Sequence, residues 1–199
     1  MLYQRKNKQG SPNPIPVVLC IGGFDPTGGA GLLADGRALS LLEVRQAGVI
    51  TALTVQRPVG RVEVFPRPTL EVGQQLQKLL TDLKPAVIKI GMLATVALAR
   101  EIARRLAKLE SAVPVVFDPV LIAGAGGRLT EPAVLTVIRD ELLPQTTLIT
   151  PNLPEAKALT GRRVASIEGM QAAGRQLQAL GARYVLVKGG HLPGRPVDV

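Results

Sequence analysis

The chain has 199 residues, of which 46% are hydrophobic and only 3% aromatic, and its formal net charge is +9 at pH 7. This length suits one α/β domain with an aliphatic core, no apolar run is long enough to span a membrane, and the basic N-terminus lacks the apolar stretch of a secretory signal. The basic residues are dispersed and are not interleaved with aromatic ones, which argues against a specific nucleic-acid site. A single cysteine, Cys20, allows no internal disulfide, and we expect a cytoplasmic protein.

In chain order, residues 1–16 predict a polar, proline-rich and mobile extension, after which apolar runs alternate with amphipathic segments. Strands are expected over 17–23, 49–56, 61–66, 86–91, 113–118, 146–150 and 183–190, and helices over 28–44, 69–83, 95–110, 131–143, 153–160 and 166–180. Continuous apolar strands that alternate with helices are typical of parallel pairing with helices on both faces. The sequence therefore predicts one three-layer α/β/α domain over 17–199, with a mostly parallel sheet.

The stretch "GGFDPTGGAGLLAD" (22–35) places five glycines between the first strand and the first helix. Glycine is kept where φ is positive or where the backbone approaches another group closely. A Walker A phosphate loop is excluded, because Gly29 and Ala30 stand where that loop needs Lys followed by Ser or Thr. A dinucleotide fingerprint starts only at Gly29, away from the strand end, and no acidic residue closes the second strand. A tight turn and a substrate loop both remain open at this point.

Polar residues collect at the carboxyl ends of the predicted strands, where ligands bind in open parallel sheets. They are Asp25, Gln56, Asp118, Asn152 with Glu155, and Lys188 with His191, and Gly91, Met92, Gly189 and Gly190 stand at the same strand ends. Acids near a lysine at a glycine turn suit magnesium and phosphate groups. Purely structural interpretations also exist: Asp25 and Asp118 precede prolines, as turn residues do. Asn152 and Glu155 match a helix capping box. The joint position of all these residues at one sheet edge favours a site.

Six motifs occur in the order and approximate spacing of the hydroxymethylpyrimidine/phosphomethylpyrimidine kinases, a thiamine-pathway family of the ribokinase-like superfamily. They are "GGFDPTGGAG", "VITALTVQ", "IKIGML", "FDPV", "LITPNLPEA" and "VLVKGGHL". The resemblance covers residues 17–195. It implies a ribokinase-like fold and ATP-dependent phosphorylation of the hydroxymethyl group of 4-amino-5-hydroxymethyl-2-methylpyrimidine, then of the resulting monophosphate.

The resemblance also implies ATP and Mg²⁺ as cofactors and gives roles to residues of this chain. Substrate-binding positions are Gly23, Asp25, Gly31, Asp35, Gln56, Met92 and Val120. Nucleotide-binding positions are Asn152, Lys188 and Gly190, with Asp118 and Glu155 around the magnesium ion. Lys188 is the expected catalytic residue, on the transferring phosphates. Gln56 reads the pyrimidine through its amide donor and acceptor, and Met92 packs on the ring.

Some positions depart from the family pattern. Phe24 stands where Ser or Thr is usual, and Leu33 where Gln is common. The family ends with a G-T-G-C or G-T-G-D loop, whose amides hold the phosphate and whose Cys or Asp accepts the hydroxyl proton, and this sequence has no match to it. We therefore expect a C-terminally incomplete fold, either a fragment or a shortened relative, whose complete form is a homo-oligomer. The alternatives are a pyridoxal-type kinase and a non-catalytic pyrimidine-binding module.

Two further expectations follow, one from the missing loop and one from the absence of helices after the last predicted strand. The chain alone should have no appreciable kinase activity, because the loss of one preorganised donor already costs about a hundredfold in rate. The last strand, 183–188, should have one uncovered face and an exposed edge, so that the chain self-associates.

Overall fold

The computed structural model describes residues 4–6, 12–55, 62–109, 113–122, 127, 129–190 and 195–199. Within this part of the chain, seven strands form the main sheet in the order β5-β4-β3-β6-β7-β8-β9. Their bounds are β3 Val17–Phe24, β4 Arg45–Val55, β5 Glu63–Pro66, β6 Val87–Ile90, β7 Val115–Phe117, β8 Leu148–Ile149 and β9 Tyr184–Val185. Every neighbouring pair is parallel except β4 with β5, so the mostly parallel α/β sheet is confirmed.

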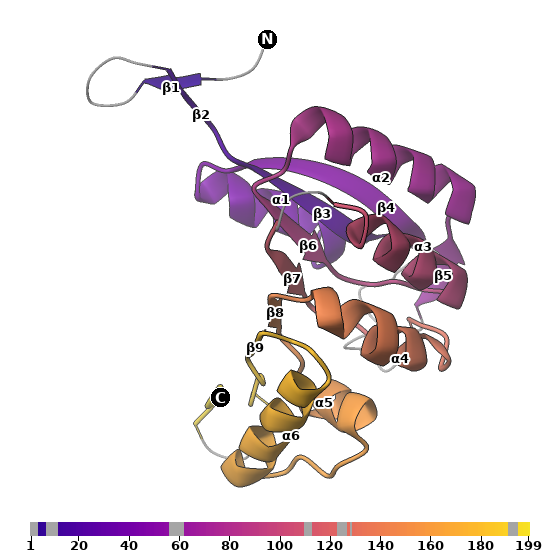
Figure 1. The fold of residues 1–199 in the computed structure, drawn as a ribbon, viewed down its shortest axis with the longest axis vertical. Coiled ribbons are helices and arrows are strands. Elements are labelled where there is room, and N and C mark those ends of the chain that lie inside the picture. Colours follow the sequence, from indigo (N-terminus) through magenta and orange to yellow (C-terminus); the bar gives the residue numbers. More distant parts are fainter. Residues whose placement is uncertain are drawn as a thin grey trace.

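Helices cover both faces of this sheet. Their bounds are α1 Gly31–Leu41, α2 Thr69–Leu83, α3 Val96–Leu106, α4 Val134–Val137, α5 Leu153–Thr160 and α6 Ile167–Ala179. In Figure 1, α2, α3 and α4 follow one another along the sheet, and α5 and α6 continue beside β9. Side chains alternate between the two faces of a strand. On β6, Ile88 and Ile90 are fully buried in the core with α3, whereas Lys89 between them contacts α1. Thus α1 lies on the opposite face, and the three layers are confirmed.

The observed bounds differ from the predicted ones in β4, which begins at Arg45 and not at residue 49, and near the chain ends. Residues predicted as an extension without regular structure contain two short strands, β1 (Gln4–Lys6) and β2 (Pro12–Pro14), which pair antiparallel. The last predicted strand, 183–190, is much shorter than expected. Only β9 is regular, and beyond it a single parallel bridge joins Asn152 to Lys188.

The segment 131–143 is not the continuous α-helix that the sequence predicts. Its α-helical part, α4, passes into a π-helical turn, η1 (Ile138–Leu142), and a 3₁₀ turn, η2 (Leu143–Gln145). Pro144 has no N–H to donate to the carbonyl four residues earlier, so the regular ladder cannot continue through it. The Thr146 hydroxyl donates to the Leu142 carbonyl oxygen at 2.8 Å and satisfies one of the freed acceptors.

Two predictions concern the last strand segment, 183–188: an uncovered face and a free edge. The first is confirmed and the second is not. Val187 is fully buried, while Tyr184 and Leu186 are 53% and 38% exposed, so one face is uncovered as expected. The prediction of a free edge is wrong at Val187, because its backbone is hydrogen-bonded to Val199. Its N–H donates to the Val199 carbonyl oxygen at 2.6 Å, and the Val199 N–H donates back at 3.0 Å. Among the described helices, none is long and apolar enough to cross a membrane.

Candidate functional site

The glycine-rich loop between β3 and α1 is held together by one buried acid. Asp25 is 4% exposed, and its carboxylate accepts hydrogen bonds from the backbone N–H groups of Thr27 at 2.9 Å and Ala30 at 3.0 Å. The Thr27 hydroxyl lies within 3.0 Å of the same carboxylate, and the Gly28 N–H donates to the Asp25 carbonyl oxygen. These bonds give Asp25 the turn-forming role that its place before a proline indicates, and they fix the path of the loop.

Two glycines that flank this loop, Gly23 at the end of β3 and Gly31 at the start of α1, lie where the chain approaches other groups closely. Gly31 has a φ of +58°, and a Cβ there would collide with the carbonyl oxygen of Gly23. A Cβ on Gly23 would lie 2.5 Å from the Met92 methyl carbon, so the missing side chain leaves room for Met92. Next to Gly23, the pairing of β3 with β4 shifts by one residue, as at a β-bulge. The loop is therefore shaped to bring the end of β6 against the end of β3.

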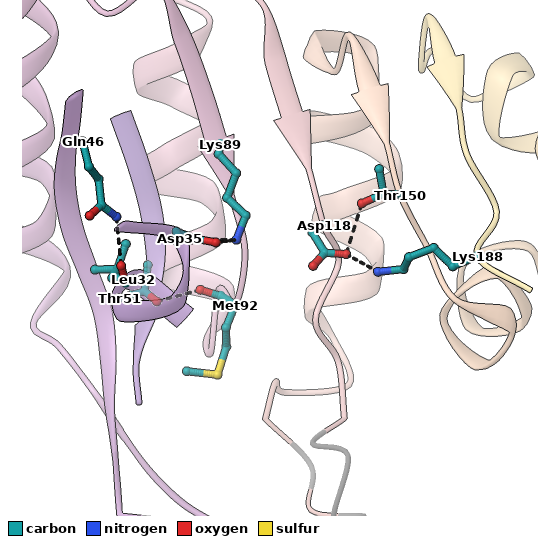
Figure 2. A network of polar contacts seen from close by, with 9 residues as sticks. All are labelled: Leu32, Asp35, Gln46, Thr51, Lys89, Met92, Asp118, Thr150 and Lys188. Carbon is teal, nitrogen blue, oxygen red and sulfur yellow. Dashed lines mark hydrogen bonds and ion pairs between the residues drawn. The ribbon is translucent and has the colours of Figure 1, made fainter. Parts of the chain in front are cut away.

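A cavity of about 260 Å³ lies at this carboxyl edge of the sheet. Its walls include six of the predicted substrate-binding residues and one of the two predicted magnesium residues: Gly23, Asp25, Gly31, Asp35, Met92, Val120 and Asp118. Gln56, the remaining predicted substrate-binding residue, lies outside the described residues. The backbone of Met92 is anchored, because the buried hydroxyl of Thr51 donates to its carbonyl oxygen at 2.6 Å. Figure 2 shows this bond together with the contacts of Asp35 and Asp118, two residues that line the cavity.

Asp118, after β7, is joined to the last strand region by an ion pair. The Lys188 ammonium lies 2.7 Å from Asp118 Oδ1, and the Thr150 hydroxyl donates to the same oxygen at 3.1 Å (Figure 2). Among the described residues, no hydrogen bond reaches Asp118 Oδ2. The predicted catalytic lysine and the predicted magnesium-binding aspartate are thus brought together. Thr150 was missed, because a threonine at a strand end is also common in turns.

Asn152 and Glu155 form the capping box of α5. The Asn152 side chain accepts from the Glu155 N–H at 2.9 Å, and the Glu155 carboxylate accepts from the Asn152 N–H at 2.8 Å. Glu155 is only 5% exposed. Burial raises the pKa of its carboxyl above the ordinary value, and the hydrogen bond from Asn152 and the charge of Lys188 oppose this shift. The structural interpretation of both residues is therefore correct, and a role in ligand binding would come in addition to it.

The two glycines after Lys188 differ in how closely other atoms approach them. The Lys188 N–H donates to the Pro151 carbonyl oxygen at 2.8 Å, which places Lys188 beside Asn152. A Cβ on Gly189 would collide with the Val197 carbonyl oxygen, whereas Gly190 has nothing within 4 Å of such an atom. Gly190, predicted to bind nucleotide, is therefore open, and His191 lies outside the described residues.

Sequence reasoning also missed Lys89, which lines the same cavity. Its ammonium lies 3.1 and 2.9 Å from the two carboxylate oxygens of Asp35. The signal for it was a single charged residue inside the apolar run "AVIKIG" (86–91). The cavity wall therefore contains both members of the Asp35–Lys89 ion pair and one member, Asp118, of the Asp118–Lys188 ion pair. No group of three or more potential metal-ligating side chains occurs among the residues that the structure describes.

Comparison with known proteins gives one family and a close structural match. A family model described as phosphomethylpyrimidine kinase matches residues 25–199. The hydroxymethylpyrimidine/phosphomethylpyrimidine kinase of Mycobacterium tuberculosis (strain ATCC 25618 / H37Rv) is 41% identical over 177 residues, 89% of this chain and 64% of the relative. The chain thus spans less than two thirds of the length of that curated relative.

Two solved structures resemble the chain. The phosphomethylpyrimidine kinase from Clostridium difficile 630 has a TM-score of 0.84 and 35% identity, covering 92% of this chain and 79% of that one. The pyridoxal kinase from Staphylococcus aureus in complex with AMP-PCP and pyridoxal has a TM-score of 0.83 and 29% identity, covering 94% of this chain and 67% of that one. These likenesses confirm the predicted ribokinase-like fold, and together with the family match they show that the chain belongs to the phosphomethylpyrimidine kinase family.

Proposed function

We propose that this chain carries the pyrimidine-binding site and part of the phosphate-binding site of a kinase. The kinase would use ATP to phosphorylate 4-amino-5-hydroxymethyl-2-methylpyrimidine, and then its monophosphate, for thiamine diphosphate biosynthesis. The observation that supports this most directly is the convergence of the glycine-rich loop, Met92 and Asp118 on one cavity at the carboxyl edge of a parallel sheet. Ligands of open α/β sheets bind at such edges.

The substrate side of the proposal depends on the cavity walls. A volume of about 260 Å³ is small for a ligand pocket and suits a single substituted ring. Met92 would pack its flexible thioether on the ring. Gly23 and Gly31 would let the backbone come close to the ring edge, and Asp35 would accept a hydrogen bond. Gln56 stays a prediction for recognition of the pyrimidine nitrogens.

The phosphate side depends on Lys188 and the residues around it. Phosphoryl transfer is catalysed mainly by positioning and charge neutralisation. Lys188 would move its ammonium from Asp118 to the transferring phosphate, and Asn152 and Gly190 would lie beside the nucleotide phosphates. Of the two acids, Asp118 fits Mg²⁺ better, because no hydrogen bond from the described residues reaches its Oδ2, which could bind the ion or its waters. Mg²⁺, when bound, would neutralise phosphate charge. Glu155 already accepts the Asn152 N–H, so its part in the magnesium site stays a prediction.

Calorimetric titration of the chain with the aminopyrimidine, and separately with pyridoxal, tests the proposal. We expect the aminopyrimidine to bind, and Met92→Ala to weaken binding about tenfold, the loss of roughly 1.4 kcal/mol of contact. Tighter binding of pyridoxal would favour the alternative, a pyridoxal-type kinase, for which the likeness to the Staphylococcus aureus pyridoxal kinase gives a specific reason. Absence of binding for both ligands would contradict the proposed site.

A second titration separates a kinase from a non-catalytic binding module. AMP-PCP with Mg²⁺ should bind the chain, and Lys188→Met should weaken that binding without weakening that of the aminopyrimidine. Binding of the aminopyrimidine alone would favour the module. A cytoplasmic location and a homo-oligomeric state stay predictions.

A further inference from the structure

Lys89 is a charged residue at a position of a central strand where an apolar residue is usual. It lies in β6 between Ile88 and Ile90, which are fully buried on the other face. On its own face, Lys89 reaches Asp35 of α1 and contacts both carboxylate oxygens, as Figure 2 shows. The two side chains are only 24% and 23% exposed. A largely desolvated ion pair is costly compared with an apolar contact, so it needs a reason beyond packing.

Attachment of α1 to the sheet does not provide that reason. α1 has another polar anchor on the sheet, because the Gln46 side chain of β4 donates to the Leu32 carbonyl oxygen at 3.0 Å. Leu32 itself is buried beneath the helix. Instead, both members of the pair line the 260 Å³ cavity, next to Gly91 and Met92. The pair therefore belongs to the wall that a ligand would touch.

The chemistry of the pair defines what it would recognise. An ammonium has three N–H donors, and contact with the two oxygens of Asp35 uses at most two of them. A carboxylate has about four acceptor positions, so Asp35 keeps acceptor capacity while its orientation is fixed from both oxygens. The cavity wall thus offers a fixed acceptor beside a cationic donor.

We propose that Lys89 is a positioning residue that fixes Asp35 as the acceptor for an N–H donor on the ring of the ligand. The inference rests on the proposed function, because the exocyclic amine of the proposed substrate has two N–H groups: Asp35 would accept one, and the other stays with the predicted contact to Gln56. Lys89 would act through Asp35, and without it the carboxylate would be free to rotate or to attract another cation. The pair would then set specificity for amine-bearing rings rather than overall affinity.

The experiment compares two probes by calorimetry on the full chain. They are 4-amino-5-hydroxymethyl-2-methylpyrimidine and the same pyrimidine with hydrogen in place of the amine. The variants are Lys89→Met, which removes the charge, and Lys89→Arg, which keeps it. The matched control is Lys78→Met, which removes an equally short but exposed ion pair with Asp82, 2.9 Å long, on the surface of α2. Circular dichroism checks the fold, and Lys89→Gln replaces Lys89→Met if that variant does not fold.

We expect the unmodified chain and Lys78→Met to prefer the amine-bearing probe about tenfold or more, as for a hydrogen bond to a charged group. Lys89→Met should reduce this preference to about threefold or less, and Lys89→Arg should retain most of it. Equal weakening of both probes in Lys89→Met, with an unchanged preference, would show a merely structural pair and overturn the inference. Binding of both probes to the unmodified chain without preference would overturn it too, and leave the proposed function intact. No binding to the unmodified chain would overturn both.

Discussion

Gly31 has a left-handed backbone conformation, and the carbonyl oxygen of Gly23 lies close to where a side chain on residue 31 would begin. Its φ is +58°, and a Cβ would collide with the Gly23 carbonyl oxygen, which belongs to the backbone of the paired strand β3. We expect Gly31→Ala to lower the free energy of unfolding by about 3 kcal/mol, of which about 1–2 kcal/mol is the cost of the left-handed conformation. Urea denaturation followed by circular dichroism measures this.

Gly161 is the matched control for this substitution. Its φ is +72°, but a Cβ there would have nothing within 4 Å. Gly161→Ala should therefore show the conformational cost alone, about 1–2 kcal/mol. Equal losses in the two variants would mean that the approach of Gly31 to Gly23 contributes nothing.

The Thr51 hydroxyl is a second residue-scale anchor of the site. It is fully buried, and its 2.6 Å hydrogen bond is to the carbonyl oxygen of Met92. Thr51→Val keeps the shape but leaves a buried acceptor without that donor, so we expect a loss of about 1–3 kcal/mol in unfolding free energy. Thr81→Val removes a similar bond to the Gln77 carbonyl oxygen on the exposed side of α2, and should change stability by less than about 0.5 kcal/mol. A smaller effect at Thr51 than at Thr81 would contradict this role.

Single residues show what the sequence can and cannot predict about the site. Asp25, Met92 and Asp118 were predictable, because each directly follows an apolar strand and parallel strands end at one edge. Lys89 and Thr150 were not, because their roles depend on contacts with Asp35 and Asp118 that only the folded sheet creates. For Lys89, the signal is a charge within an apolar strand, and such a charge is as readily explained by an exposed sheet face.

At the scale of elements, periodicity predicts the regular helices well and the irregular ones poorly. Helix α2 has the predicted bounds, Thr69–Leu83, because its leucines recur on one face. The segment 131–143 has apolar residues at helical spacing too, but periodicity does not show whether the backbone bonds are of the α, π or 3₁₀ type. Pro144 changes that pattern over the turn before it. The apolar pattern also predicts strands that are longer than the observed β8 and β9, because residues stay buried beyond the point where strand pairing ends.

An ion-pair cluster on α3 provides a prediction on the pH dependence of stability. Glu101 of α3 accepts hydrogen bonds from Arg104 at 2.7 Å and Arg105 at 2.8 Å. Partial burial alone would raise the pKa of the Glu101 carboxyl, but these bonds and charges lower it below its ordinary value. The folded state therefore binds fewer protons than the unfolded one between the two pKa values. The stabilisation is fully present above about pH 4.3 and is lost as the pH falls through the folded-state pKa.

Glu101→Gln should accordingly lower the free energy of unfolding at pH 7 by about 1 kcal/mol, and by less at a pH below the folded-state pKa. Urea denaturation across this pH range gives both values. Glu141→Gln is the control: Glu141 pairs with Arg100 at 3.2 Å, and the side chains are 40% and 62% exposed. Its effect should stay below about 0.5 kcal/mol at both pH values. A Glu101→Gln loss that is independent of pH would contradict the assigned cause.

At the scale of the whole molecule, the sheet face that α1 occupies is covered unevenly. α1 packs on β3 and β4, and farther along this face Val116 and Leu148 are half-buried, while Tyr184 and Leu186 are 53% and 38% exposed. Apolar side chains grouped at a sheet edge favour association. We expect the sedimentation coefficient of the chain to rise with concentration, starting from that of a 21.0 kDa monomer.

Replacing both exposed residues tests whether this face is responsible. The double variant Tyr184→Thr with Leu186→Thr should remain monomeric over the same concentration range. Leu70→Thr is the control, because Leu70 is 73% exposed but lies on α2, against the other face. If the unmodified chain stays monomeric, or if association survives the double substitution, the exposed residues have no part in assembly.

The Asp35–Lys89 and Asp118–Lys188 ion pairs each join residues that are far apart in the sequence, and the two separations differ. Asp35 and Lys89 are 54 residues apart, and Asp118 and Lys188 are 70 residues apart. A chain made from its N-terminus therefore contains both members of the first pair before Asp118 has been added. At roughly 5–20 residues per second, Asp118 then waits about 4–14 s for Lys188 to be synthesised. On the ribosome, the wall proposed for the ring can form while the aspartate proposed for magnesium is still without its lysine.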